Sequence, residues 1–191
     1  MRRLLCTLMV LFAFVNANAS SDTMVEIPLI GLRCNDRVAN DDAVRARLRR
    51  PDTEAVSPAV VIFHSNAGVI GVGDNYARRL VQNGFVTLEV DSYTPRSVRS
   101  GNDRNAPTAC DRLNDAWSAL YYLSQDPLVN TQKVGAVGLS SWGLVSLMLA
   151  KGFFPRGMAS ADHRIQAIKG MRYKKFLFCI LHAAIFSTMK S

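Results

Sequence analysis

The stretch that decides the fold is Val134-Gly135-Ala136-Val137-Gly138-Leu139-Ser140-Ser141-Trp142-Gly143, which reads as an apolar strand turning sharply into a helix. Such a turn lifts a serine hydroxyl above the sheet, beside a helix N-terminus that stabilises negative charge. Small residues flank the serine because strand and helix come close. Gly138 meets this requirement, whereas Trp142 does not, and the second glycine is displaced to Gly143. The pattern predicts a nucleophile at Ser140; the alternative is a serine that caps an ordinary helix.

Strands and helices are expected to alternate on both sides of this turn. Short apolar or alternating runs predict strands at 25–32, 44–49, 59–63, 85–90 and 133–139. Periodic apolar residues predict helices at 75–83, 110–124 and from 143 to 150. Asp74 is the expected cap of the first helix, and Gly84 its C-terminal stop.

This alternation predicts the α/β class, with a mostly parallel central sheet flanked by helices. The runs at 59–63 and 133–139 are too apolar to face water, as is typical of strands buried on both sides. In such sheets the chemistry gathers beyond the carboxyl ends of the strands. The residues expected there are 64–68, 91–96 and 140–142.

The first 19 residues are predicted to be a secretory signal peptide. Two arginines precede an apolar run at 4–15, and Ala17-Asn18-Ala19 is a small-x-small cleavage site. The run is too short for an ordinary spanning helix, although a retained membrane anchor is the alternative. We therefore expect an exported protein, periplasmic or secreted, that begins at Ser20.

The charge pattern argues against a nucleic-acid partner, and the cysteines bear on disulfides and metal binding. Cleavage at this site removes two arginines and lowers the formal net charge from +8 to +6. Arginines at 45, 47, 49 and 50 are expected to lie on the solvated face of a strand, so we expect no nucleic-acid partner. Cys34, Cys110 and Cys179 remain after cleavage, and Cys34–Cys110 is a plausible bridge that sequence alone does not establish. The absence of a CxxC pair predicts no metal site, and we expect no cofactor.

Three segments resemble the dienelactone hydrolase family. Residues 58–64 (PAVVIFH) are similar to the strand that leads to its oxyanion loop, and residues 84–96 (GFVTLEVDSYTPR) to its next strand and the following Asp-x-aromatic-x-Pro-Arg ending. Residues 110–130 are similar to its next helix. The resemblance covers about 28–168, is strongest over 58–143, and implies an α/β-hydrolase fold that is incomplete at the C-terminus.

The resemblance also implies roles for individual residues. Ser140 would attack the carbonyl of a small-molecule ester or lactone and form an acyl-enzyme. The backbone N–H of Ser141, with one from the loop at Ser65 and Asn66, would hold the oxyanion. Arg96 matches a position near the substrate pocket and could pair with a substrate carboxylate.

The chain departs from the family pattern at two positions. Ser65 stands where a glycine is common after the loop histidine. Trp142 replaces the second glycine of the bend at Ser140, which we call the elbow, and its indole could narrow the pocket or distort the turn. His64 is expected to be structural, because the base follows the nucleophile in this fold. Asp91 is expected to order its loop rather than to act in catalysis.

The acid and histidine of a triad are not identified. After Ser140 the chain holds one acid, Asp162, and two histidines, His163 and His182; Asp162 is expected at the wrong end of the sheet, and His182 lies in an apolar run. We therefore expect a domain at 20–168 that is impaired as a hydrolase, because an unassisted serine hydroxyl stays protonated.

Residues 169–191 form a basic and then apolar tail. It could act as a substitute core element, lie weakly on a membrane surface, or result from a shifted reading frame. The alternative functions are an inactive relative that binds a ligand or partner, and a membrane-surface protein. The sequence gives neither the substrate nor the oligomeric state.

Overall fold

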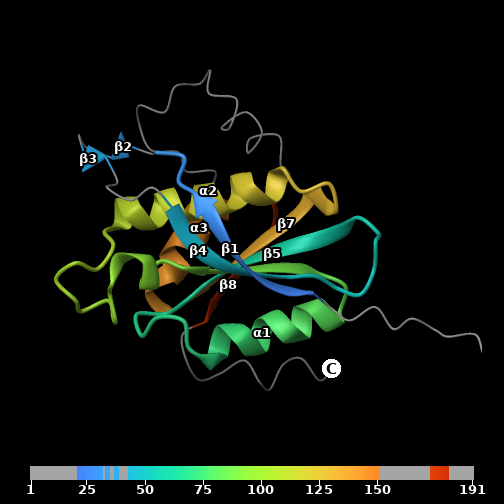
Figure 1. Ribbon diagram of the computed structural model, residues 1–191, viewed down its shortest axis with the longest axis horizontal. Helices are drawn as coiled ribbons and strands as arrows, with labels where there is room; N and C mark the ends of the chain where they lie inside the picture. The colour runs from blue at the N-terminus through green and yellow to red at the C-terminus, as the bar shows by residue number, and fades with distance from the viewer. Residues whose placement is uncertain (1–20, 32, 35–36, 39–42, 151–172, 181–191) are drawn as a thin grey trace, which may run out of the picture.

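A computed structural model describes residues 21–31, 33–34, 37–38, 43–150 and 173–180 of the chain (Figure 1). For residues 33–34, 37–38, 150 and 173–180 it describes the backbone. The predicted signal peptide, residues 151–168 of the predicted domain and most of the tail lie outside this part of the chain.

A single six-stranded sheet forms the centre of the described structure. Its strand order is β1-β4-β6-β5-β7-β8. The strands are β1 (Asp22–Pro28), β4 (Ala43–Arg49), β5 (Ser57–Phe63), β6 (Val86–Asp91), β7 (Val129–Leu139) and β8 (Tyr173–Ile180). The pairs β6–β5, β5–β7 and β7–β8 are parallel, whereas β4 joins β6 and β1 joins β4 in antiparallel fashion. The expected mostly parallel sheet is therefore confirmed, and the carboxyl ends of its parallel strands β6, β5, β7 and β8 lie at one edge.

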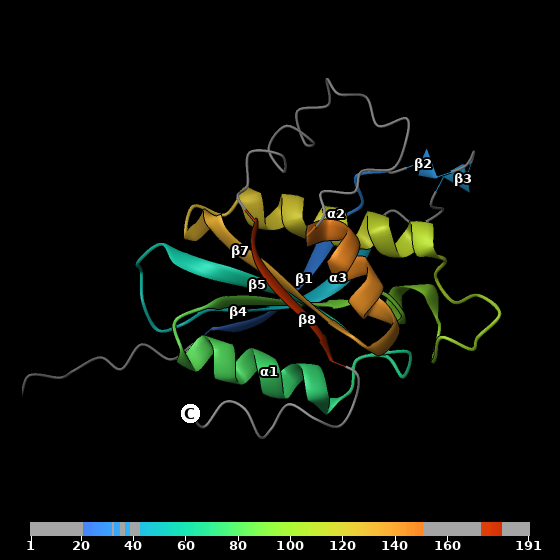
Figure 2. The ribbon, with the colours of Figure 1, turned by 180° about the vertical axis from the view of Figure 1, so that it is seen from behind.

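Helices cover both faces of the sheet (Figures 1 and 2). One face carries α1 (Gly71–Gln82), and the other carries α2 (Ala109–Ser124) and α3 (Gly143–Ala150). A separate two-stranded ribbon joins β2 (Arg33–Cys34) to β3 (Arg37–Val38). No helix among the described residues is both long enough and apolar enough to cross a membrane.

The core lies in two layers set by the alternation along β5. Val61 and Phe63 pack toward α2 and α3, while Val60 and Ile62 pack toward Ala77 of α1. Helix α2 is more deeply buried than its one-sided apolar pattern predicted, because every residue from Leu113 to Leu120 is buried. It begins with a capping box between Thr108 and Asp111, which fixes its first turn.

The helix before Gly84 begins earlier than the sequence predicted. Helix α1 starts at Gly71 with Ile70 as its cap, so Asp74 is not the capping residue. The Asp74 carboxylate instead binds arginines, among them Arg49 of β4 and Arg78 one turn along the helix. Gly84 has φ +83°, which explains why the helix stops there, since an L side chain is strained in this region.

The arginines of β4 do not all lie on a solvated face. Arg45 and Arg47 are exposed as expected, but only 5% of Arg49 is accessible. Its guanidinium binds Asp22, Asp74 and Glu89, and we call these four residues the Arg49 cluster. Burial raises the pKa of Glu89, and the neighbouring Arg49 opposes that shift. The solvated-face prediction is wrong at Arg49 because α1 and β1 bring carboxylates over it.

Strand β8 falls within the tail that the sequence analysis set apart at 169–191. Its backbone pairs in parallel with β7, from Val134 opposite Tyr173 to Leu139 opposite Ile180. This placement agrees with the alternative in which part of the tail substitutes for a core element.

Candidate active site

Ser140 lies at a strained bend at the carboxyl end of β7. Leu139 still has extended dihedrals, φ −90° and ψ 126°, and Ser140 then turns to φ +55° at the start of a 3-10 turn, Ser140–Trp142, that continues into α3. A non-glycine residue in this region costs on the order of 1–3 kcal/mol. Ser140 is nevertheless exposed. The strand, turn and helix predicted at this position are present, with the serine as the first residue of the turn.

Gly138 allows β7 and the following turn to approach each other. A Cβ atom built at Gly138 would lie 2.2 Å from the Trp142 carbonyl oxygen and 2.5 Å from Ser146 Oγ. Because the first of these atoms is backbone, it cannot move aside at low cost. The sequence therefore identified the requirement for a small residue two positions before the serine.

Trp142 points into the core instead of narrowing the approach to Ser140. It is fully buried and stacks on Phe63, with ring centroids 5.4 Å apart and planes inclined by 11°. The bend at Ser140 forms despite the missing glycine, because φ at residue 142 is not positive.

The loop after β5 reaches the residue that follows Ser140. Ser65 and Gly68 form a short bridge, and the Ser65 hydroxyl accepts from the Ala67 N–H at 3.2 Å. Asn66 Oδ1 accepts from the Ser141 hydroxyl at 2.7 Å. The candidate oxyanion residues Ser65, Asn66 and Ser141 thus come together at one edge of the sheet.

His64 is structural, as the sequence analysis expected. Its Nδ1 donates to the Ser65 carbonyl at 2.7 Å, and its Nε2 accepts from the Ser92 N–H at 3.3 Å. The ring is buried, and this burial lowers the pKa of His64 below its usual range. The neutral imidazole therefore ties the end of β5 to the end of β6, with no ring nitrogen left to act as a base.

Asp91 orders its loop, again as expected. One carboxylate oxygen, Oδ1, accepts from the backbone N–H groups of Tyr93 and Thr94, each at 3.0 Å. These bonds start the 3-10 turn Thr94–Arg96. Through Oδ1, Asp91 therefore orders this turn.

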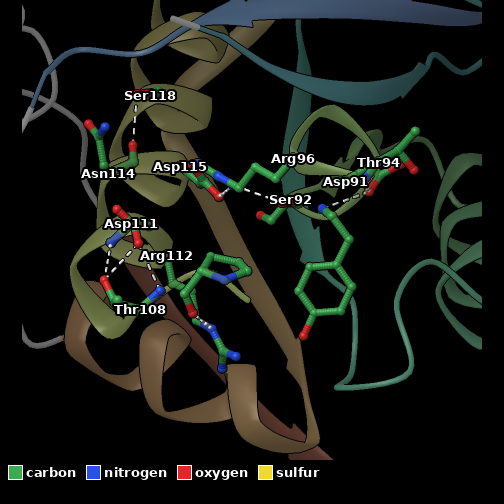
Figure 3. A network of polar contacts seen from close by, with 12 residues as sticks. Asp91, Ser92, Thr94, Arg96, Thr108, Asp111, Arg112, Asn114, Asp115 and Ser118 are labelled. Carbon is green, nitrogen blue, oxygen red and sulfur yellow. Dashed lines mark hydrogen bonds and ion pairs between the residues drawn. The ribbon is translucent and has the colours of Figure 1, made fainter. Parts of the chain in front are cut away.

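The structure argues against the substrate-binding role expected for Arg96. Its guanidinium makes two bonds of 2.8 Å to the carboxylate of Asp115 and a third to the Ser92 carbonyl (Figure 3). Asp115 is fully buried on α2, and burial raises its pKa while Arg96 opposes the shift. A bidentate pair of this kind holds the loop on the helix. No local pattern in the sequence indicates this ion pair, because Arg96 and Asp115 meet only through packing.

Arg112 is a residue that the sequence analysis did not single out. From α2 its NH1 donates to Ser141 Oγ at 3.4 Å, its Nε donates to the Pro107 carbonyl at 3.2 Å, and its guanidinium lies 5.1 Å from the Trp142 ring centroid. Only its position in the predicted helix was evident beforehand. The contacts place a cation next to the elbow.

The remaining candidates are not placed. Asp162, His163 and His182 lie outside the described residues. Within those residues, no group of three His, Cys, Asp or Glu side chains could hold a metal ion. Cys110 is disulfide-bonded, which agrees with the expected bridge at this cysteine, and the Cys34 side chain is not described.

A mixed, centrally parallel sheet with a strained serine between strand and helix defines the class of α/β-hydrolase folds. The sequence model of the Dienelactone hydrolase family matches residues 44–163. The chain belongs to this family.

A curated relative and several solved structures are similar to parts of the chain. An uncharacterised Pseudomonas aeruginosa protein, PA2218, is 31% identical over 94 residues, which are 49% of this chain and 22% of that protein. Its crystal structure aligns with a TM-score of 0.53 at 22% identity, over 76% of this chain and 40% of that one. An esterase from the archaeon Pyrobaculum calidifontis aligns with a TM-score of 0.52 at 22% identity, over 69% of this chain and 38% of that one.

These structural similarities show the α/β-hydrolase fold. The chain spans about two-fifths of the length of the solved structures and about a fifth of the sequence relative.

Proposed function

We propose that this protein cleaves small carboxylic esters or lactones through an acyl-enzyme on Ser140. The observation that carries the proposal is the exposed serine at φ +55° between β7 and α3, at the edge where the Ser65–Gly68 loop also lies. Strain at an exposed polar residue is typical of functional sites, because folding alone would favour glycine there. Family membership supports an ester-type hydrolase as the general class.

In the proposed reaction Ser140 Oγ bonds to the substrate carbonyl carbon, and the carbon–oxygen bond to the alcohol breaks. The serine proton passes through a general base to the departing alkoxide, and water then releases the acid. Backbone N–H groups of Ser141 and of Ser65 or Asn66 would stabilise the oxyanion, on the order of 3 kcal/mol for each donor.

His64, the one histidine among the described residues, uses both ring nitrogens internally and is not available as a general base. This supports the proposal of an impaired hydrolase, whose turnover is slow because a serine hydroxyl depends on an adjacent base. The same observation favours the second candidate, a relative that binds a ligand or partner without turning it over. We propose export to the periplasm or exterior in either case, on the sequence of residues 1–19, and weak membrane contact through the tail on its basic and apolar composition.

Turnover of an activated ester, such as a p-nitrophenyl ester, tests the proposal. Slow hydrolysis that Ser140→Ala abolishes is the expected result. Hydrolysis that Ser140→Ala leaves unchanged would contradict the serine route. Ligand-induced thermal stabilisation without any hydrolysis would favour the binding protein.

A further inference from the structure

Side chains link the two halves of the proposed oxyanion hole. Ser141 and Asn66 are 75 positions apart in the chain, yet the Ser141 hydroxyl donates to Asn66 Oδ1 at 2.7 Å. One residue follows the proposed nucleophile, and the other lies in the loop that would supply the second N–H donor. A single side-chain hydrogen bond thus connects the two segments that would carry the donors.

Arg112 determines the direction of that bond. A guanidinium can only donate, so its NH1, 3.4 Å from Ser141 Oγ, occupies a lone pair of the hydroxyl oxygen. The hydroxyl proton is then available to Asn66. Arg112 is itself held by the Pro107 carbonyl and by the Trp142 ring, and the described residues offer it no carboxylate partner.

Asn66 is fixed from its other side by the loop after β6. The Gly101 N–H donates to the Asn66 carbonyl at 2.8 Å, and a Cβ at Gly101 would lie 2.5 Å from Asn66 Cγ. Only a glycine allows the asparagine side chain to lie against this backbone. The loop after β5, the loop after β6, helix α2 and the elbow thus converge on one hydroxyl.

We propose that the Ser141 hydroxyl is a positioning group, which holds the Asn66 loop and the elbow at the spacing that an oxyanion requires. This inference rests on the proposed function. Ser141 acts here through its side chain, in addition to the backbone N–H assigned to the oxyanion hole. Arg112 orients the Ser141 hydroxyl, and Asn66 Oδ1 accepts its hydrogen bond.

The test uses the full 191-residue protein and a fluorophosphonate probe, whose attack on Ser140 places negative charge on an oxygen. Ser141→Ala and Asn66→Ala are each expected to lower the maximal labelling rate about tenfold, because donors are misplaced but not removed. The probe concentration that gives half of this rate should not change. The double variant should lose no more than either single variant, since one bond is broken in all three.

Hydrogen exchange provides a second measurement that does not depend on Ser140 reactivity. The amides of residues 65–68 should exchange about tenfold faster in Ser141→Ala, and Ser141→Thr should restore both protection and labelling. Ser124→Ala is the matched control, because its hydroxyl donates locally to the Tyr121 carbonyl at the far end of α2. It should change neither measurement.

Three outcomes overturn the proposal, and they are distinguishable. If the wild-type protein is labelled and Ser141→Ala is labelled equally fast, the positioning role fails while the proposed function stands. If no probe labels the wild-type protein at Ser140, both fail. Additive losses in the double variant would also contradict a shared bond.

Discussion

The Arg49 cluster and the bend at Ser140 differ in how their polar side chains are placed: one is buried and paired, and the other is exposed on a strained backbone. In the cluster, a buried guanidinium contacts three carboxylates from β1, α1 and β6. At the elbow, Ser140 is exposed on a strained backbone, next in sequence to Ser141, whose hydroxyl contacts the loop after β5. The first arrangement uses charge to join elements. The second accepts strain in order to present one atom, which is why we assign chemistry there.

The largest loss of stability is expected from a substitution in the Arg49 cluster. Arg49→Met leaves Glu89 buried without its cation, and breaking a buried pair costs about 3–5 kcal/mol. Arg45→Met is the matched control on the same strand, because Arg45 is half exposed and its nearest carboxylate, on Glu26, is 3.9 Å away. It should cost less than about 1 kcal/mol. Urea unfolding followed by circular dichroism measures both, and equal losses would contradict a structural role for the cluster.

The second-largest loss of stability is expected when a methyl group is added at Gly138. Gly138→Ala places a Cβ against the Trp142 carbonyl, so the elbow must shift, at a cost of about 3 kcal/mol. Gly71→Ala provides the contrast, since nothing lies within 4 Å of its Cβ position at the start of α1. It should leave stability unchanged or raise it by about 0.5 kcal/mol. A thermal unfolding series compares the two variants; a tolerated Gly138→Ala would mean that strand and turn are not in close contact.

His64 should make stability fall on acidification. Its folded pKa lies below the unfolded value of 6.5, so the unfolded chain binds more protons as the pH drops below about 6.5. Its contribution is complete above that pH and is lost toward the folded pKa, at up to about 1.4 kcal/mol per pH unit. His64→Gln should remove this slope when unfolding free energies are measured from pH 7.5 to 5. An unchanged slope would assign the effect to other groups.

The smallest change in stability is expected when a serine with positive φ is replaced by glycine, and this replacement distinguishes backbone strain from a catalytic role. Ser140 and Ser97 share φ 55°, so replacement of either by glycine should stabilise the protein by about 1 kcal/mol. Only Ser140→Gly should abolish ester hydrolysis. If Ser97→Gly abolished it as well, the special role of residue 140 would be lost.

The sequence predicted the parts of this structure that depend on local order. Apolar runs located β5, β6 and β7, and the Gly138–Ser140 pattern located the elbow, because each reflects the needs of neighbouring residues. His64 and Asp91 received their structural roles from position alone, and the bonds to Ser92 and Thr94 confirm them.

The errors arose where distant segments meet. The resemblance to the family places Arg96 near a substrate, whereas the structure pairs it with Asp115, 19 residues away on α2. The sequence predicts that Asp74 caps a helix beginning at residue 75, whereas α1 begins at Gly71. The alternating pattern of β4 predicts a solvated Arg49, and local sequence cannot place β1 and α1 above it. No local pattern indicates that Ser141 reaches Asn66.

The most direct test of the central claim is to map where a fluorophosphonate attaches to the protein. Peptide mass spectrometry should find the label on Ser140 alone, acquired slowly in the wild-type protein, at the same rate in Ser97→Gly, and absent from Ser140→Ala. A label on another serine, or none on Ser140 after prolonged incubation, would contradict the assignment of this bend as the nucleophile.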